Sequence, residues 1–398
     1  MTICNYGCSW LNRCGWYVLK RREYWINKIE EAWGRHSIVW LSGVRRAGKT
    51  CLSQCLPEIE YLDCELPRVR QRLEDPEGFL SSLGSRRLVL DEIHRLANPS
   101  ELLKIAADHY PAVRIVATGS SRLGASFKFK DTLAGRKSDI WLTPMNSHDL
   151  HDFNAGDLKH RLLRGGLPPF FLAPSLAEGE FQSWVDAFWS KDIQELFRLE
   201  RRYSFNRFFE LLMLSSGGIF EATRFAGDCE ASRQTITNYL SVLEETFVAH
   251  VLRPFHTRKS SEIVSSPKVY AFDTGFTAYW RGWYELRRED MGLLWEHFVL
   301  NELNSILQGR EIRYWRDKQG HEIDFVIPRS GTAPLAIECK WSVKAFDPAN
   351  LQLFRKRYPD GENLIVCADV SAAYKRNFDG LEVCFSPVGS LSNFLEKK

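Results

Sequence analysis

The feature that most constrains this chain is a glycine-bounded segment, Gly43-Val44-Arg45-Arg46-Ala47-Gly48-Lys49-Thr50. It follows an apolar run at residues 38–41 that predicts a buried strand, and it precedes residues 51–56, which can continue as a helix. A loop of this kind between a strand and a helix start is the context that a phosphate-binding loop requires. Its backbone N–H groups can point at phosphate oxygens, and the helix N-terminus adds partial positive charge. A chance match in a turn is the alternative, and both flanking segments argue against it.

Two side chains of this loop have predicted roles toward a nucleotide. Lys49 is expected to reach the β- and γ-phosphates, and the Thr50 hydroxyl is expected to bind Mg²⁺. The expected nucleotide contacts are the eight residues of the loop, from Gly43 to Thr50, and the following Cys51.

A later apolar strand delivers two acids. Residues 87–90 run directly into Asp91 and Glu92, and open α/β sheets bind ligands at the carboxyl ends of their strands. In P-loop ATPases the first acid holds Mg²⁺ through water and the second activates the attacking water, so Asp91 and Glu92 fit these roles. A helix N-cap after the strand is the alternative. The upstream loop favours the functional interpretation, with ATP and Mg²⁺ as cofactors.

Two further segments offer contacts to the nucleotide. Residues 113–117 predict another strand, and Thr118 or Ser120 at its end could sense the γ-phosphate or simply form a turn. Arg136 could supply charge to a transition state, also across subunits, or could form a surface ion pair. The alternation of strands and helices predicts a mostly parallel sheet.

Composition restricts the class of protein. The 398 residues are too many for one ordinary core, and the 44% hydrophobic and 26% charged fractions are those of a soluble globular protein. A net charge of +3 does not by itself indicate nucleic acid. Ten scattered cysteines, no apolar run of membrane-span length and no signal-peptide pattern predict a cytoplasmic protein without a membrane partner. We expect the leader, residues 1–17, to be poorly ordered.

The middle of the chain predicts a helical unit. Residues 181–197 indicate one long helix, while residues 222–229 and 232–245 form a helix–turn–helix candidate capped by Ser232. Two strands, at 248–252 and 268–272, could add a β wing. The second helix of the pair presents side-chain types that read base edges, namely Arg233, Gln234, Thr237 and Asn238. DNA binding and a structural lid over the nucleotide remain equal alternatives.

The last third of the chain begins with an acidic helix. Residues 291–307 predict a helix with Glu296 at the border of its apolar face and Glu302 near the centre. A carboxylate on an apolar face needs a partner or a function.

Strands at 312–316, 322–327 and 335–340 follow this helix. Asp324 projects from the second strand, and Glu338 and Lys340 point to one side of the third. Together with a helix acid, Asp324 and Glu338 could bind a divalent metal, and Lys340 could activate water. A salt-bridged sheet is the alternative.

These segments together resemble a family of bacterial and archaeal AAA-type ATPases, related to the STAND and origin-recognition ATPases, whose C-terminal domain has unknown function. The likeness begins near Tyr17 and runs to the C-terminus. It rests on the phosphate loop and on residues 90–94, 118–121, 135–136, 165–168, 232–240, 268–275, 295–296, 321–326 and 338–340.

The resemblance implies an α/β fold in three parts. A P-loop NTPase core with a parallel sheet would occupy residues 18–150, and a helical lid with a winged helix residues 151–275. A C-terminal α/β domain of the restriction-endonuclease type, similar to PD-(D/E)XK nucleases, would occupy residues 276–398. There the resemblance favours Glu296 over Glu302 as the helix acid beside Asp324, Glu338 and Lys340.

The combined prediction is an ATPase switch that controls a DNA-related C-terminal domain. One alternative is a metal-dependent DNA nuclease regulated by ATP. Another is a non-catalytic module that binds DNA or a protein partner, and self-association is compatible with each of them.

Overall fold

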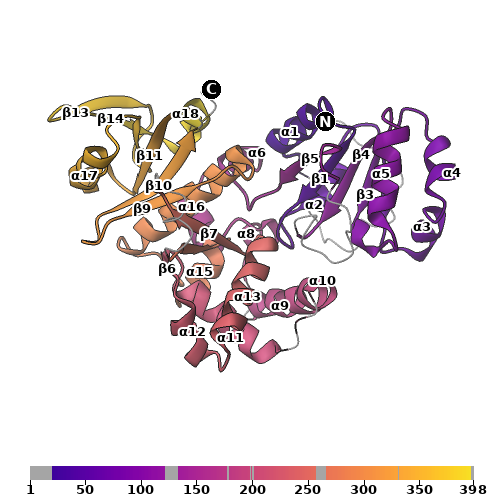
Figure 1. The fold of residues 1–398 in the computed structure, drawn as a ribbon, viewed down its shortest axis with the longest axis horizontal. Coiled ribbons are helices and arrows are strands. Elements are labelled where there is room, and N and C mark those ends of the chain that lie inside the picture. Colours follow the sequence, from indigo (N-terminus) through magenta and orange to yellow (C-terminus); the bar gives the residue numbers. More distant parts are fainter. Residues whose placement is uncertain are drawn as a thin grey trace.

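Two β-sheets joined by a helical unit organise the molecule (Figure 1). The computed structural model describes residues 20–121, 133–176, 179–197, 199, 201–256, 266–329 and 331–395. The predicted leader, residues 1–17, lies outside the described residues. None of the helices in the described ranges is both long and apolar enough to cross a membrane.

The first sheet carries the phosphate-binding segment. Its described strands are all parallel, in the order β2-β3-β4-β1-β5, which confirms the predicted parallel sheet. The strands are β1 (Ile38–Ser42), β2 (Ile59–Asp63), β3 (Arg87–Asp91), β4 (Arg114–Gly119) and β5 (Lys137–Trp141). The helices around it are α1 (Glu23–Trp33), α2 (Lys49–Gln54), α3 (Pro67–Arg72), α4 (Pro76–Ser81), the short 3₁₀ turn η1 (Ile93–Arg95) and α5 (Pro99–His109).

The helical unit lies below and between the two sheets in Figure 1. It comprises α6 (Ser147–Asp152), α7 (Leu158–Arg164), α8 (Pro168–Phe171), α9 (Glu180–Phe188), η3 (Trp189–Ile193), α10 (Gln194–Phe197), α11 (Arg202–Leu214), α12 (Ala222–Asp228), α13 (Arg233–Glu245) and α15 (Thr274–Trp280). The predicted long helix over 181–197 is present as a continuous helical run, α9-η3-α10, with one local difference from a regular α-helix. Its middle, η3, is a π-helix, which accommodates one extra residue per turn and is frequent at functional sites.

An aromatic core fixes this helical unit against the phosphate loop. Trp184 on α9 stacks on Phe188 and Phe272 at centroid distances of 5.2 and 5.3 Å. The same buried cluster contains Val44 and Ala47 of the loop. The helical unit and the first sheet therefore share one hydrophobic core. We refer to α9 with η3, which lie beside the loop, as the lid.

The second sheet has nine described strands in the order β13-β14-β12-β11-β10-β9-β7-β8-β6. The predicted wing strands pair with each other, and β7 also pairs with β9, so the sheet runs across the predicted boundary at 275/276. Its strands are β6 (Gly218–Ile219), β7 (Ala249–Pro254), β8 (Lys268–Ala271), β9 (Arg313–Arg316), β10 (Glu322–Arg329), β11 (Thr332–Lys340), β12 (Asn363–Cys367), β13 (Tyr374–Phe378) and β14 (Leu381–Ser386). The helices and turns on it are α16 (Asp290–Leu307), η4 (Val343–Ala345), α17 (Ala349–Arg357), η5 (Val388–Ser390) and α18 (Ser392–Leu395).

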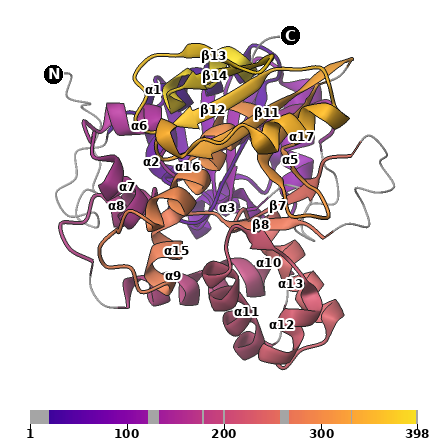
Figure 2. The same ribbon diagram turned by 90° about the vertical axis from the view of Figure 1, so that its left-hand side faces the viewer.

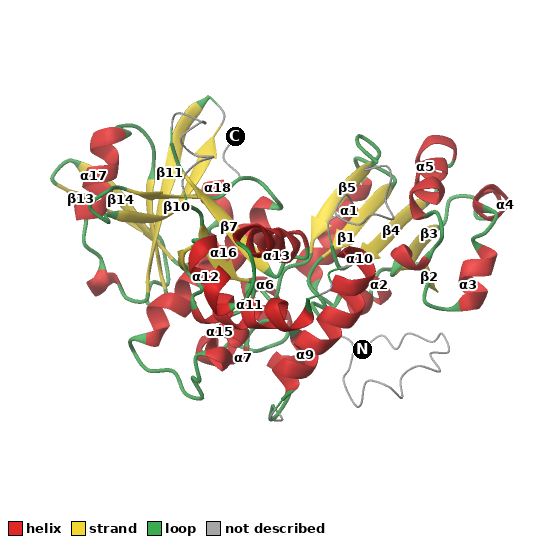
Figure 3. Cartoon of the chain, turned by 60° about the horizontal axis from the view of Figure 1, so that its bottom comes forward, coloured by secondary structure: helices red, strands yellow, loops and turns green. Residues whose placement is uncertain are grey.

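The long helix α16 connects the two sheets. Figures 2 and 3 show it beside the C-terminal sheet and close to α6 of the helical unit. At its end the Gln308 side chain bonds both backbone groups of Trp141 at the edge of the first sheet, with Oε1 accepting at 2.8 Å and Nε2 donating at 3.1 Å. The hydroxyl of Tyr24 on α1 donates to the Ser305 carbonyl at 3.0 Å.

Candidate functional site

The phosphate loop owes its shape to two glycines. Gly43 and Gly48 adopt φ angles of 152° and 99°, in the region that favours glycine. A Cβ on Gly43 would lie only 2.4 Å from the Leu142 carbonyl oxygen, so a larger residue would collide with the strand end beside it. The loop leads directly into α2, whose N-cap is Gly48. The backbone therefore has the curl and helix start that bind phosphate.

Lys49 is folded into this loop. Its Nζ donates to the carbonyls of Gly43 at 2.8 Å and Val44 at 3.3 Å, and its side chain is buried. Burial lowers the pKa of Lys49, and the negative charge of Glu92 opposes this effect. The ammonium thus lies where the loop would surround a phosphate.

Asp91 is the centre of a hydrogen-bond network that joins three strands and a helix. Its Oδ2 accepts from the Thr50 hydroxyl at 2.8 Å and from the Tyr61 hydroxyl at 2.6 Å. Its Oδ1 accepts from the Thr118 hydroxyl at 2.5 Å. The structure therefore brings together Thr50, Asp91 and Thr118, which the sequence singled out separately. Sequence reasoning missed Tyr61, although it lies on β2, the strand that pairs with β3.

Glu92 follows Asp91 with a left-handed backbone, at φ 51°. Its N–H donates to the Thr118 hydroxyl at 2.9 Å, which fixes this conformation, and its carboxylate lies 3.2 Å from His94 Nδ1. Burial raises the pKa of Glu92 to about 7, and the nearby Lys49 opposes the shift. Glu92 is therefore a carboxylate able to accept a proton near neutral pH.

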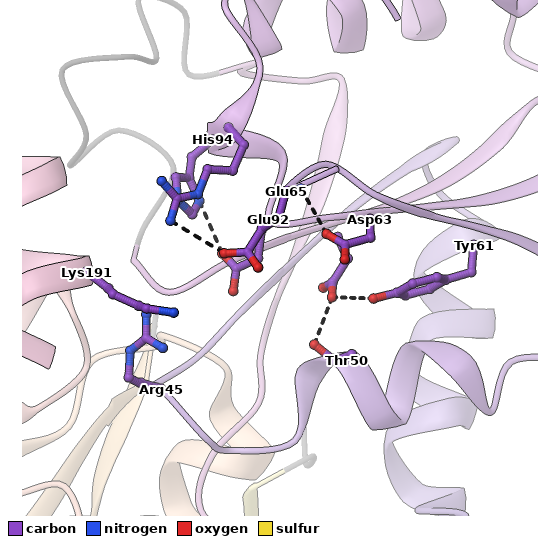
Figure 4. A pocket seen from close by; sticks show the side chains of 10 residues that line it. Arg45, Thr50, Tyr61, Asp63, Glu65, Glu92, His94 and Lys191 are labelled. Carbon is purple, nitrogen blue, oxygen red and sulfur yellow. Dashed lines mark hydrogen bonds and ion pairs between the residues drawn. The ribbon is translucent and has the colours of Figure 1, made fainter. Parts of the chain in front are cut away.

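These groups face a pocket of about 230 Å³. Figure 4 shows Thr50 and Tyr61 on one side of it and Arg45 and Lys191 on the other, with Glu92 between them. Lys191 belongs to η3 of the lid, so the pocket has walls from both the sheet and the helical unit.

Two arginines connect the loop to distant segments. Arg45 Nε donates to Asp192 Oδ2 in η3 at 2.5 Å, and the Arg45 carbonyl accepts from Trp184 Nε1 at 3.2 Å. Arg22 donates to the Ala47 carbonyl at 2.8 Å and to both oxygens of Asp149 at 2.7 and 2.6 Å. Sequence reasoning missed these contacts, because no local pattern marks partners that lie 127 or 147 residues apart.

Three further residues predicted for the nucleotide site, Arg136, Ser120 and Cys51, do not line the pocket. Arg136 pairs with Asp108 at 2.7 Å, which is the surface ion pair that the sequence left open. Ser120 is buried at the end of β4, and Cys51 is exposed on α2. Neither these two nor Arg136 is among the described residues that line the pocket.

A second constellation of charged groups lies in the C-terminal sheet. Carboxylate oxygens of Glu296, Glu322 and Asp324 lie within 4.8 Å of one another. Lys268 Nζ is bonded to Glu296 at 2.8 Å and to Glu322 at 2.5 Å, and the Tyr270 hydroxyl donates to Glu296. Sequence reasoning missed Glu322, although it lies two residues from Asp324 on β10 and therefore on the same face.

Glu338 and Lys340 lie on the neighbouring strand β11. Lys340 Nζ contacts Glu338 Oε2 at 2.8 Å, while the buried Glu338 Oε1 has no hydrogen-bond partner within the described residues. Asp324 Oδ2 accepts from the Cys339 N–H at 2.8 Å. Burial raises the pKa of Asp324 to about 6 and that of Glu338 to about 7. The site thus contains carboxylates of the kind predicted to bind a metal ion, and also the Lys340–Glu338 ion pair expected for a salt-bridged sheet.

Glu302, the other glutamate of α16, has a different environment. Its carboxylate accepts from the Ser147 N–H at 2.5 Å and from the Ser147 hydroxyl at 3.0 Å. Burial raises its pKa to about 7. Glu302 therefore joins α16 to the start of α6 and does not belong to the carboxylate cluster around Glu296.

The predicted recognition helix is α13. Ser232 accepts from the Thr235 N–H at 3.1 Å, which confirms the predicted N-cap. The four side chains proposed to read bases are all exposed: Arg233, Gln234, Thr237 and Asn238.

Comparisons with known proteins place these features in a family. The chain is 30% identical over 335 residues to an uncharacterized protein of Mycobacterium tuberculosis, and the alignment covers 81% of this chain and 74% of that protein. An uncharacterized protein of Mycobacterium bovis matches with the same values. Residues 35–151 match the model of the AAA domain. The chain belongs to this family of AAA-type P-loop ATPases. The AAA domain of this ATPase is its nucleotide-binding part and contains the phosphate loop, Asp91 and Glu92.

Two further stretches of this AAA-type ATPase match family models without assigned function. Residues 155–287 match a domain of unknown function (DUF8612), and residues 291–384 match another (DUF4143). Among solved structures, a Walker-type ATPase of Pyrococcus abyssi is 16% identical with a TM-score of 0.42, covering 66% of this chain and 96% of that one. AMPPCP-bound DnaA from Aquifex aeolicus is 12% identical with a TM-score of 0.26, covering 55% of this chain and 86% of that one.

Proposed function

We propose that this AAA-type ATPase is a Mg²⁺-dependent switch in which ATP hydrolysis at the loop Gly43–Thr50 acts on the C-terminal domain. The observation that carries the proposal is the network at Asp91, in which the hydroxyls of Thr50 and Thr118 both contact its carboxylate. An acid that is oriented in this way beside a phosphate loop suits Mg²⁺, which prefers oxygen ligands.

Each residue of the network has a distinct role in hydrolysis. Bound Mg²⁺ would neutralise charge on the phosphate oxygens. Thr50 and Asp91 would hold the metal ion, and Lys49 would exchange the loop carbonyls that it now contacts for phosphate oxygens. Glu92 would orient a water molecule and accept its proton. The Thr118 hydroxyl accepts from the Glu92 N–H and donates to the Asp91 carboxylate. It therefore holds Asp91 and Glu92 in a fixed position relative to each other.

A chain of contacts supports an effect on the C-terminal domain. Arg22 holds the Ala47 carbonyl of the loop and the Asp149 carboxylate of α6. The first residue of α6, Ser147, is bonded to Glu302 on α16. A movement of the loop on nucleotide binding would therefore reach α16, the helix that also bears Glu296 of the carboxylate cluster.

Nucleotide binding is tested first with Lys49→Ala. Loss of a charge-assisted contact to phosphate costs about 1.5–3 kcal/mol, so we expect ATP affinity to fall roughly 10- to 100-fold. Titration calorimetry with Mg²⁺ and ATP measures this. Lys104→Ala on the exposed face of α5 is the matched control and should bind like the wild type. Equal affinity of Lys49→Ala and the wild type would contradict the assigned loop.

A second candidate function is metal-dependent DNA cleavage by the C-terminal domain, with Asp324, Glu338 and Lys340 in the roles of a PD-(D/E)XK nuclease. The cluster of Glu296, Glu322 and Asp324 favours it, because three carboxylates suit a hard divalent cation. The ammonium of Lys268 lies against this cluster and supplies positive charge where a metal ion would. The exposed side chains of α13 would contact the DNA, and DNA or protein binding without cleavage remains the alternative.

The metal site is tested by Lys268→Met. The change removes the cation bonded to Glu296 and Glu322 and leaves three carboxylates that repel one another. A divalent ion would then relieve more repulsion than in the wild type. We expect saturating Mn²⁺ to raise the unfolding temperature of the variant by roughly 3 °C more than that of the wild type.

The control for this experiment is Lys375→Met, which breaks an exposed ion pair with Glu382 elsewhere in the same sheet. This variant should respond to Mn²⁺ as the wild type does. An identical Mn²⁺ response in Lys268→Met, Lys375→Met and the wild type would exclude a metal site at the cluster.

A further inference from the structure

The lid contributes a lysine to the nucleotide pocket. Lys191 lies on η3 and lines the pocket together with Arg45, Thr50 and Glu92. Its side chain is exposed and makes no ion pair or hydrogen bond with any part of the chain that the structure describes. Figure 4 shows Lys191 and Arg45 entering the pocket from the same side, opposite Tyr61.

Buried neighbours in the π-helix hold the backbone on which this lysine lies. Its neighbours Trp189, Asp192 and Ile193 are buried, and Asp192 is bonded to Arg45 of the loop at 2.5 Å. A π turn shifts the side chains relative to those of an α-helix. In η3, Asp192 faces the loop while the adjacent Lys191 faces the pocket.

Lys191 differs from Arg45 and Lys49 in the pairing of its charge. Asp192 already neutralises Arg45, and Lys49 is held by the carbonyls of the loop. The pocket is otherwise rich in acids, with Asp63, Glu65, Asp91 and Glu92 among its lining residues. Lys191 is therefore a lid cation without a counter-ion in the described structure, and it faces the place where the phosphates of a nucleotide would lie.

We propose that Lys191 is the residue through which the lid recognises the terminal phosphate, so that the protein distinguishes a nucleoside triphosphate from a diphosphate. The proposal rests on nucleotide binding at the loop Gly43–Thr50. An ammonium is an effective point-charge partner for phosphate. An ion pair of Lys191 with the γ-phosphate would draw η3 toward the loop. Asp192, the next residue of η3, already contacts Arg45 of the loop, so both contacts would hold η3 on the same side. Loss of that phosphate on hydrolysis would release η3.

The ratio of two affinities tests this proposal. We expect Lys191→Ala to weaken binding of a non-hydrolysable ATP analogue roughly 10-fold, the loss of one charge-assisted contact, and to change ADP affinity less than about 2-fold. Lys191→Arg keeps the charge and should retain most of the preference. Lys159→Ala, which removes an exposed lysine of α7 in the same helical unit, should match the wild type. Unfolding temperatures of all variants check that the lid is folded.

The outcomes separate this proposal from the proposed function. An analogue-to-ADP affinity ratio that is the same in Lys191→Ala and the wild type overturns the role of Lys191, even if the wild type hydrolyses ATP. A wild type that binds both nucleotides but hydrolyses nothing contradicts the switch, and the affinity ratio still decides the role of Lys191. A wild type that binds neither nucleotide overturns both.

Discussion

Glu92→Gln should lower the kcat for ATP hydrolysis by roughly 10²- to 10⁴-fold, which is the usual contribution of a general base. Glutamine has the shape of glutamate but cannot accept a proton from water. The hydrogen bond from the residue 92 N–H to Thr118 does not involve the side chain and should persist. Steady-state phosphate release measures the effect.

Binding should respond differently from turnover in this variant. Removing the Glu92 charge also removes repulsion toward phosphate, so ATP affinity should stay equal or rise. Glu65→Gln is the matched control, because Glu65 is a second acid of the pocket and is exposed. Its kcat should remain within about 2-fold of the wild type, as is usual for groups that do not take part in proton transfer. Wild-type turnover in Glu92→Gln would assign the catalytic base to another residue.

Arg22→Ala should be the most destabilising of the substitutions considered, by about 3–5 kcal/mol. The side chains of Arg22 and Asp149 are 4% and 0% exposed, so removing one partner leaves the other charge buried without compensation. The Ala47 carbonyl of the loop would also lose its donor. Chemical denaturation followed by tryptophan fluorescence measures the change in unfolding free energy.

The neighbouring residue provides the control. Arg21 pairs with Glu23 at 2.7 Å, close to the 2.6 Å between Arg22 and Asp149, but the Arg21 and Glu23 side chains are 54% and 52% exposed. Arg21→Ala should therefore cost less than about 1 kcal/mol. A double variant with Asp149→Asn beside Arg22→Ala should recover part of the loss, because the unpaired charge is gone. Equal costs for Arg21→Ala and Arg22→Ala would show that burial of the pair is energetically irrelevant.

The parts of the fold that were predictable from the sequence are those with local causes. The loop Gly43–Thr50 has a backbone conformation that needs glycines at fixed spacing. Ser232 caps the helix that begins at the next residue by accepting from the N–H three residues further on. Asp91 follows an apolar strand directly. In each case the residue type and its chain neighbours determine the structure.

The remaining features depend on packing between distant segments. Nothing in the chain near Arg22 signals Asp149, and nothing near Lys191 indicates that η3 reaches the pocket. Helical periodicity tolerates one extra residue, so the apolar spacing over 181–197 did not reveal the π turn. Pairing of β7 with β9 joins strands separated by a helical region, and strand order is set by tertiary contacts. Glu322 could have been predicted as a member of the carboxylate cluster, because residues two apart on a strand point to the same face and Glu322 lies two residues before Asp324.

ATP turnover decides most directly whether hydrolysis takes place at this loop, and it is measured with the purified wild type and with Lys49→Ala, prepared in parallel with Mg²⁺ present. We expect steady phosphate release by the wild type and its loss in Lys49→Ala, and no release when Mg²⁺ is chelated. Equal release by the two proteins, or release that is independent of Mg²⁺, would contradict hydrolysis at this loop.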